Sequence, residues 1–131
     1  MKLELIDMFI DTDNNPATGY SVGDYPAGSG MDYLLEGPAA SPGWGSVYVH
    51  SGAPADWVFN PVSSFDAEMI FSAIKPVSGK NIIEFSIKKS TLGSLKGFIN
   101  FALVELNSGW SAIGRIPQSG TPESKFIAVQ L

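Results

Sequence analysis

The chain lacks cysteine, long apolar runs and an excess of positive charge. Without cysteine it can form no disulfide framework, no zinc–thiolate site and no cysteine nucleophile. No segment approaches the ~20 consecutive apolar residues that a membrane-spanning helix needs. Eight lysines and arginines stand against thirteen acidic residues, for a formal net charge of −5. Nucleic acid and anionic membranes are therefore poor partners, because both require a basic face.

Signatures of catalysis are also scarce. His50 is the only histidine, and its neighbour Ser51 does not make a hydrolytic triad, so we interpret His50 as a strand residue at a sheet surface. The glycine-rich stretch 23–30 lacks the Lys-Ser/Thr ending and the following helix of a phosphate-binding loop. Four glutamates fall in predicted strands, where a solvated face is the commoner role: Glu36, Glu68, Glu84 and Glu105. We expect no enzymatic activity.

What is present points to β-structure. The 131 residues are 44% apolar, enough for one core, and fourteen glycines and nine prolines divide them into short segments. We expect a single domain, residues 1–131, with an all-β fold: a two-sheet antiparallel β-sandwich, jelly-roll-like, with almost no helix. The predicted strands are Leu3–Ile10, Met31–Gly37, Ser46–His50, Ala67–Ile74, Asn81–Lys88, Phe98–Leu106, 110–116 and Ser124–Leu131.

Three local patterns refine this expectation. Phe98–Leu106 is apolar on both alternations, which predicts a central strand. The segment Ser78–Asn81 between two apolar runs predicts a hairpin turn. The best helical candidate is a single turn over Ser90–Leu95, with Ser90 as its cap.

The segment between Thr12 and Met31 is long and irregular, and loops of this length usually have a function or are held in place by a bound group. If the flanking strands pair antiparallel, Asp11 ends one strand where Asp32 begins the other, and Asp13 lies just above them. Clustered carboxylates repel each other unless a cation lies among them. Calcium accepts such irregular oxygen ligands, and Asp11-x-Asp13-x-Asn15 matches the first half of an EF-hand loop, although the later glycine and the flanking helices are missing. The alternative is that these are ordinary turn residues.

The same region resembles a known family. The runs Phe9-Ile10-Asp11-Thr12-Asp13-Asn14-Asn15-Pro16-Ala17-Thr18-Gly19-Tyr20 and Met31-Asp32-Tyr33-Leu34-Leu35-Glu36 are similar to secreted β-sandwich domains of the family 9 carbohydrate-binding module and DOMON-like group. A weaker likeness lies in Ile83–Ile87 followed by Ser90–Gly93. Together these likenesses run from about residue 3 to residue 106.

The resemblance implies a jelly-roll-like sandwich with calcium near the Asp motif. The ligands that it implies in this chain are Asp11, Asp13, Asp32, the side chain of Asn15 and the carbonyl of Thr18. Such domains have one or more strands before the motif, whereas only Leu3–Ile10 precedes it here. Either an N-terminal strand is therefore missing, or another region of the chain supplies that edge. Because the chain opens and closes almost flush with predicted strands, we expect it to be part of a longer secreted or surface protein, located outside the cell or at its surface.

The resemblance leaves the ligand open, since some members bind sugars and others bind haem. Haem is disfavoured because one histidine offers little axial ligation. Sugar binding needs exposed aromatic faces, and the candidates are Trp44, Trp57, Trp110 and Tyr25, although at least one tryptophan is expected in the core. The leading hypothesis is a non-catalytic, calcium-stabilised accessory module with carbohydrate as ligand. The alternative is a structural or adhesive domain that assembles with neighbouring chains and binds no small ligand.

Overall fold

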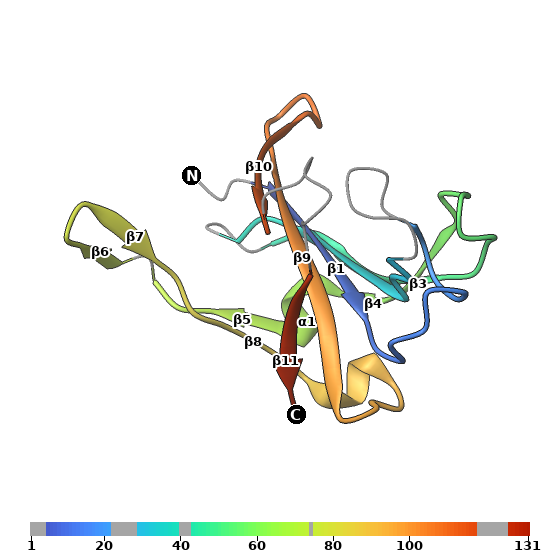
Figure 1. Ribbon diagram of the computed structural model, residues 1–131. Helices are drawn as coiled ribbons and strands as arrows, with labels where there is room; N and C mark the ends of the chain where they lie inside the picture. Colours follow the sequence, from blue (N-terminus) through green and yellow to red (C-terminus); the bar gives the residue numbers. More distant parts are fainter. Residues whose placement is uncertain (1–4, 22–28, 40–42, 74, 118–125) are drawn as a thin grey trace.

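The computed structural model describes residues 5–21, 29–39, 43–73, 75–117 and 126–131, and it is all-β, as predicted (Figure 1). Its main element is a seven-stranded antiparallel sheet in the order β10-β9-β1-β2-β3-β4, with β11 also pairing with β9. The strands of this sheet are β1 (Leu5–Asp11), β2 (Tyr33–Gly37), β3 (Ser46–His50), β4 (Phe59–Ser64), β9 (Phe98–Leu106), β10 (Ala112–Ile116) and β11 (Ile127–Gln130). Among the described residues, no helix is long and apolar enough to cross a membrane.

Strands β1 and β9 form the centre of the sheet. All seven residues of β1 are buried, since β2 flanks it on one side and β9 on the other. The prediction that Phe98–Leu106 is central is confirmed, because β10 and β11 both pair with the far edge of β9. Strands buried on both faces need apolar residues on both alternations.

The two faces of the main sheet bury different residues. Ile6, Met8 and Ile10 of β1 face one core cluster, which also contains Leu35 and Phe65. The alternate residues Leu5 and Phe9 face a second cluster with Leu34, Met31 and Val104. This division follows from the two-residue period of a strand, which sends neighbouring side chains to opposite faces. We call the face that carries Ile6, Met8 and Ile10 the apolar face, and the face that carries Leu5 and Phe9 the loop face.

A small second layer covers the apolar face. It consists of the two-stranded sheet β5 (Met69–Phe71) and β8 (Phe85–Ile87), the one-turn helix α1 (Phe65–Glu68) and the 3₁₀ turn η1 (Lys89–Leu92). A separate hairpin, β6 (Lys75–Val77) and β7 (Lys80–Ile82), projects away from the sheet (Figure 1). Its two turn residues Ser78 and Gly79 both have positive φ, which confirms the predicted turn.

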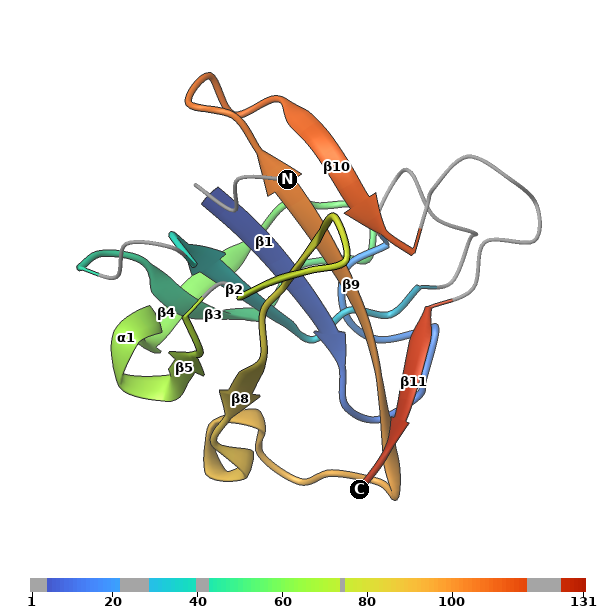
Figure 2. The same ribbon diagram turned by 90° about the vertical axis from the view of Figure 1, so that its left-hand side faces the viewer.

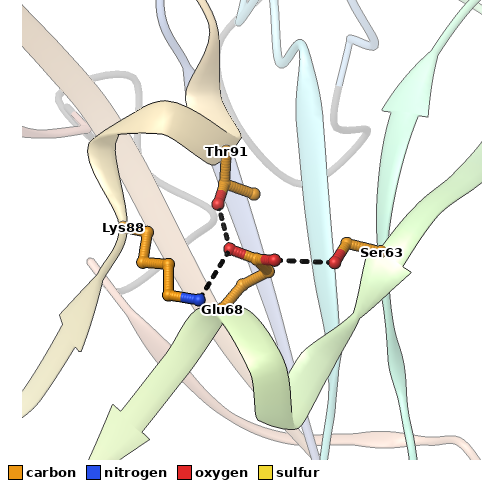
Figure 3. A network of polar contacts seen from close by, with 4 residues as sticks. All are labelled: Ser63, Glu68, Lys88 and Thr91. Carbon is orange, nitrogen blue, oxygen red and sulfur yellow. Dashed lines mark hydrogen bonds and ion pairs between the residues drawn. The ribbon is translucent and has the colours of Figure 1, made fainter.

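Glu68 connects η1 with α1 and with β4 of the main sheet (Figure 3). Its carboxylate accepts hydrogen bonds from the Ser63 hydroxyl at 2.7 Å and from the Thr91 hydroxyl, and Lys88 Nζ lies 3.9 Å away. These bonds lower the pKa of Glu68, first through Thr91 and then through Ser63. The network joins α1, β4 and η1 at one point, so Glu68 has a structural role here.

Several predicted elements are wrong in detail. Ala67 and Glu68, predicted in a strand, belong to α1, because Phe65 buries its ring against Gly37, where a Cβ would lie 2.7 Å from that ring. The predicted strand Asn81–Lys88 is split between two sheets, β7 and β8. Strands β4 and β6 were not predicted, since both contain a proline, and η1 begins after Lys88 rather than after a Ser90 cap.

Candidate functional site

The three aspartates predicted to cluster lie together at the neck of the β1–β2 hairpin. The last paired residues of the two strands are Ile10 and Tyr33, and Asp32 N donates to Ile10 O at 2.9 Å. Each aspartate contributes one carboxylate oxygen to a group in which all oxygens lie within 4.8 Å of one another. Asp11 is buried, and Asp13 and Asp32 are partly buried. The antiparallel pairing thus brings together carboxylates that are 21 positions apart in the sequence, from residue 11 to residue 32.

Asp11 and Asp13 organise the backbone that follows them. Asp11 Oδ1 accepts from Asp13 N at 3.2 Å and from Asn14 N at 2.7 Å. Asp13 Oδ1 accepts from Asn15 N at 2.9 Å. These bonds are typical of Asp in tight turns. The turn role and a metal role are compatible, because each carboxylate oxygen has two lone pairs.

Asp32 is held by Thr12 across the neck. Its Oδ2 accepts from Thr12 N at 2.9 Å and from the Thr12 hydroxyl at 2.8 Å. Burial raises the pKa of Asp32; the two bonds from Thr12 oppose this rise, while the charges of Asp13 and Asp11 add to it. Asp32 is therefore easier to protonate than an exposed aspartate, and a bound cation would offset the repulsion that Asp13 and Asp11 exert on it.

Two glycines allow the loop to close over this neck. Tyr20 and Met31 form an isolated bridge, with Tyr20 N donating to Met31 O at 2.7 Å. Gly19 and Gly30 adopt positive φ of 68° and 61°. A Cβ on Gly30 would lie 2.5 Å from Asn15 O, so a larger residue cannot fit without moving the loop.

The remaining predicted ligands, Asn15 and Thr18, take part in the same turn. Asn15 Oδ1 accepts from Ala17 N at 3.1 Å, and its carbonyl oxygen accepts from Thr18 N at 3.1 Å. The Thr18 hydroxyl donates to Asp13 Oδ1 at 3.2 Å. Thr18 therefore reaches the carboxylates through its side chain, and metal ligation by its carbonyl stays a prediction.

Asn100 on β9 is a further member of the site that the sequence did not reveal. It lies opposite Asp11 in the β1–β9 register. Its Nδ2 donates to Asp11 Oδ2 at 3.0 Å and to Asn14 Oδ1 at 3.1 Å. The one signal in the sequence is a polar amide inside the apolar run of Phe98–Leu106. Its partner, 89 positions away, is set by strand pairing alone.

The three carboxylate oxygens could hold a metal ion, and their spacing can be compared with the dimensions of a calcium site. Calcium binds oxygens at about 2.3–2.6 Å, so two ligands on opposite sides of one ion lie about 5 Å apart. The three carboxylate oxygens are within 4.8 Å of one another, which meets this limit. Asp32 Oδ1 accepts no hydrogen bond from the described residues, so it retains its full capacity as a ligand.

All three tryptophans are exposed, so the expectation that at least one lies in the core is wrong. Trp44 is 51% exposed, and Trp57 and Trp110 are each 55% exposed. They lie in loops or turns outside the strands, whereas phenylalanines such as Phe9 and Phe65 fill the buried aromatic positions.

Trp44 and Trp110 form an exposed pair with ring centroids 6.4 Å apart and planes inclined by 64°. Trp110 has φ of +62°, a strained conformation for a bulky residue. The side chain of Asn107 supports this turn by accepting from Gly109 N at 2.9 Å and Ser111 N at 3.0 Å. A strained, exposed aromatic beside a second one is a candidate for ligand contact.

Trp57 belongs to a different aromatic cluster, which includes Tyr20 of the Asp loop, the segment 11–21 that carries Asp11 and Asp13. Its ring lies 5.1 Å from Tyr20 and 5.0 Å from Phe59, both edge to face. His50 packs on Phe59 and its Nε2 lies 2.9 Å from Asp56 O. His50 is a strand residue, as predicted. Trp57 is thus packed by its neighbours, and Tyr25, the fourth predicted aromatic, lies outside the described residues.

A second pair of carboxyl groups lies on the loop face, between the strands. Asp7 and Glu36 are directly opposite each other in the β1–β2 register. Burial, with a smaller part from Glu36, raises the pKa of Asp7 from 3.8 to about 7. Asp7 Oδ1 is buried without a hydrogen-bond partner among the described residues. The pair therefore holds a proton near neutral pH.

The chain matches no protein-family model, and no curated protein and no solved structure is significantly similar to it. The family resemblance therefore depends on the motif residues themselves.

Proposed function

We propose that this chain is a non-catalytic, extracellular β-sandwich module that is stabilised by calcium at Asp11, Asp13 and Asp32 and binds carbohydrate through exposed aromatics. The observation that carries the proposal is the meeting of three carboxylates within 4.8 Å at the hairpin neck. Bound calcium would neutralise these charges and tie the loop to both strands. Thr12 and Asn100 would orient the carboxylates of Asp32 and Asp11.

Calcium is expected to stabilise the folded chain. A ligand that binds only the folded state, at 100 times its dissociation constant, adds about 2.7 kcal/mol to the free energy of unfolding. We expect calcium to raise the melting temperature measured by circular dichroism, and EDTA to reverse the rise. Magnesium should act more weakly, because it demands stricter octahedral geometry.

A matched pair of variants separates the site from general charge effects. Asp32→Asn should abolish the response to calcium. Asp66→Asn should retain it, since Asp66 is an exposed acid on α1, outside the site. A wild-type chain whose melting temperature is the same in calcium and in EDTA would refute the site.

The carbohydrate part of the proposal is supported by the Trp44–Trp110 pair. Sugar rings stack their C–H faces on exposed aromatic rings, and neighbouring polar groups accept or donate to the hydroxyls. Both rings are more than half exposed and lie 6.4 Å apart. Together they offer more aromatic surface than a single side chain.

Retention on a panel of insoluble polysaccharides tests this part. Trp44→Ala should reduce retention, while Trp57→Ala, which removes an equally exposed tryptophan from the other cluster, should not. If the wild-type chain is retained on no glycan, the carbohydrate part fails and the calcium part stands. Calcium-dependent oligomers seen by light scattering would instead favour the structural or adhesive alternative.

A further inference from the structure

The apolar face of the main sheet is only partly covered by the second layer. A cavity of about 310 Å³ remains between β8 and β11, over the floor made by β1 and β9. Its floor includes Met8, Ile10, Ile99 and Phe101, and its walls include Ile87 and Val129. In Figure 2 the strands β8 and β11 lie on either side of β1 and β9. We call this cavity the β8 groove.

Along the edge of β8 that does not pair with β5, the described residues supply no strand partner for the backbone groups. Ile70 and Ser86 are directly opposite in the β5–β8 register. On either side, Ser72 N donates to Glu84 O and Lys88 N donates to Glu68 O. In an antiparallel ladder alternate residues bond to the same neighbour, so Glu84, Ser86 and Lys88 face β5. The N–H and C=O groups of Phe85 and Ile87 therefore point to the other edge.

The same two residues direct their side chains toward the main sheet. Ile87 packs on the apolar-face core, and the Phe85 ring lies 6.3 Å from the Phe101 ring. β8 pairs with no strand of the described residues other than β5. An apolar floor beside a free strand edge has the chemistry that a further β-strand satisfies, with backbone bonds to the edge and apolar side chains on the floor.

We propose that the β8 groove accepts an extended β-strand from another polypeptide, antiparallel to β8, with apolar side chains at alternate positions. Among the described residues that line the groove, Lys89 carries the charged side chain, and it follows β8 in the chain. An antiparallel strand begins at that end, so an acidic residue near its start complements Lys89.

Two other occupants fit the groove less well. A small apolar molecule would leave the backbone groups of Phe85 and Ile87 unpaired. A second copy that offered its own β8 would bring its own β1–β9 floor into the space of this one, because β8 lies directly over that floor. A strand from a flexible segment avoids both problems.

The probe is an acetylated octapeptide that begins with glutamate and then alternates valine and threonine. We expect binding by isothermal titration calorimetry, and slower hydrogen exchange at the Phe85 and Ile87 amides by NMR. Residues opposite Phe85 and Ile87 share their face, so the valines lie on the floor and their N–H groups bond to β8. N-methylation of the valines should abolish binding, whereas N-methylation of the threonines should preserve it.

Two lysine variants test the position of the strand. Val129→Lys adds a charge at the groove wall and should weaken binding at least tenfold. Ile113→Lys makes a similar change on β10, outside the groove, and should leave binding unchanged. Both residues are substantially exposed, at 40% and 58%, so both variants should fold, which their circular dichroism spectra check. Both should also keep the calcium response, which separates failure of the groove from failure of the metal site.

Four results would overturn the inference. The first is no peptide binding at a peptide concentration of about 1 mM. The second is equal loss of binding on methylation of valines and of threonines, which would show that the β8 edge is not used. The third is saturation of the groove by an apolar dye that no peptide displaces. The fourth is self-association of the chain that Val129→Lys abolishes, which would assign the groove to a second copy.

Discussion

The two faces of the main sheet are covered by different kinds of structure. The apolar face carries Ile6, Met8 and Ile10 from β1 and is covered by short regular elements, with a groove left open. The loop face carries Asp7 and Phe9, and Tyr20 and Met31, from the irregular segment after β1, pack against its core. The carboxylates Asp7 and Glu36 share this second face, and the Asp loop begins beside it. Strand β1 thus directs Ile6, Met8 and Ile10 to one face of the sheet and the acidic side chain of Asp7 to the other.

This difference indicates how much stability each face should lose when a buried side chain is shortened. Regular elements packed on apolar side chains relax little when an atom is removed. An irregular loop, held by side-chain hydrogen bonds such as that between Thr12 and Asp32, can move to fill a gap. The following variants test this contrast, from the largest expected effect to the smallest.

Leu35→Ala and Leu34→Ala compare neighbouring residues that face opposite sides. Both side chains are almost fully buried, at 0% and 2% exposure. Truncation of a buried leucine costs about 2–5 kcal/mol. We expect Leu35→Ala near the upper end and Leu34→Ala near the lower end, because the loop can settle into the space. Urea unfolding measures both, and an equal or larger loss for Leu34→Ala would break the contrast.

Asp7→Asn tests the cost of the buried acid pair. The pKa of Asp7 rises from 3.8 to about 7 on folding, so between these pH values the folded state keeps a proton that the unfolded state has lost. Stability therefore falls as pH rises from about 4 to about 7, and levels off above. The variant should reduce this slope, although the raised pKa values of Glu36 and Asp32 keep part of it, and it should be more stable at pH 8 by a few kcal/mol.

Thermal unfolding across this pH range checks the prediction for Asp7→Asn. The exposed Asp66→Asn serves as its control and should keep the wild-type slope. If Asp7→Asn is less stable than the wild type at pH 8, Asp7 is charged and paired in the folded chain, contrary to the expected protonated state.

Asn100→Ala tests the link between β9 and the Asp loop. The change removes bonds to Asp11 Oδ2 and Asn14 Oδ1 and should cost about 1–2 kcal/mol. If calcium binds as proposed, its affinity should also fall about 10–100-fold, because Asn100 orients a ligand. Calorimetric calcium titration measures this. Asn60→Ala, which removes a bond to Ser51 in which none of the site residues takes part, should leave calcium affinity unchanged.

Ile82→Thr should have the smallest effect. Ile82 lies on the β6–β7 hairpin and is 47% exposed, and this hairpin projects from the apolar side (Figure 1). We expect the free energy of unfolding to change by no more than about 0.5 kcal/mol. A larger loss would show that the hairpin packs on the domain in solution.

Strand β9 and the Asp loop are two regions that the local sequence predicted correctly. The predicted bounds Phe98–Leu106 and Ser46–His50 match β9 and β3, since apolar runs between turn residues mark their own limits. The meeting of Asp11 with Asp32 followed from assuming one antiparallel hairpin. By contrast, Ala67 and Glu68 entered a helical turn because Phe65 had a buried position to fill, and no local pattern records that.

By itself, the sequence determined the all-β class, the central strand Phe98–Leu106 and the acidic neck of one hairpin. Each follows from alternation, turn residues and the pairing of neighbouring strands, which act over short distances along the chain. Only the tertiary structure decided that Asn100 reaches Asp11, that Trp44 meets Trp110 and that β8 has, among the described residues, no strand partner on the side of the apolar groove. These depend on contacts between segments distant in sequence, where the packing of the whole chain sets which side chains meet.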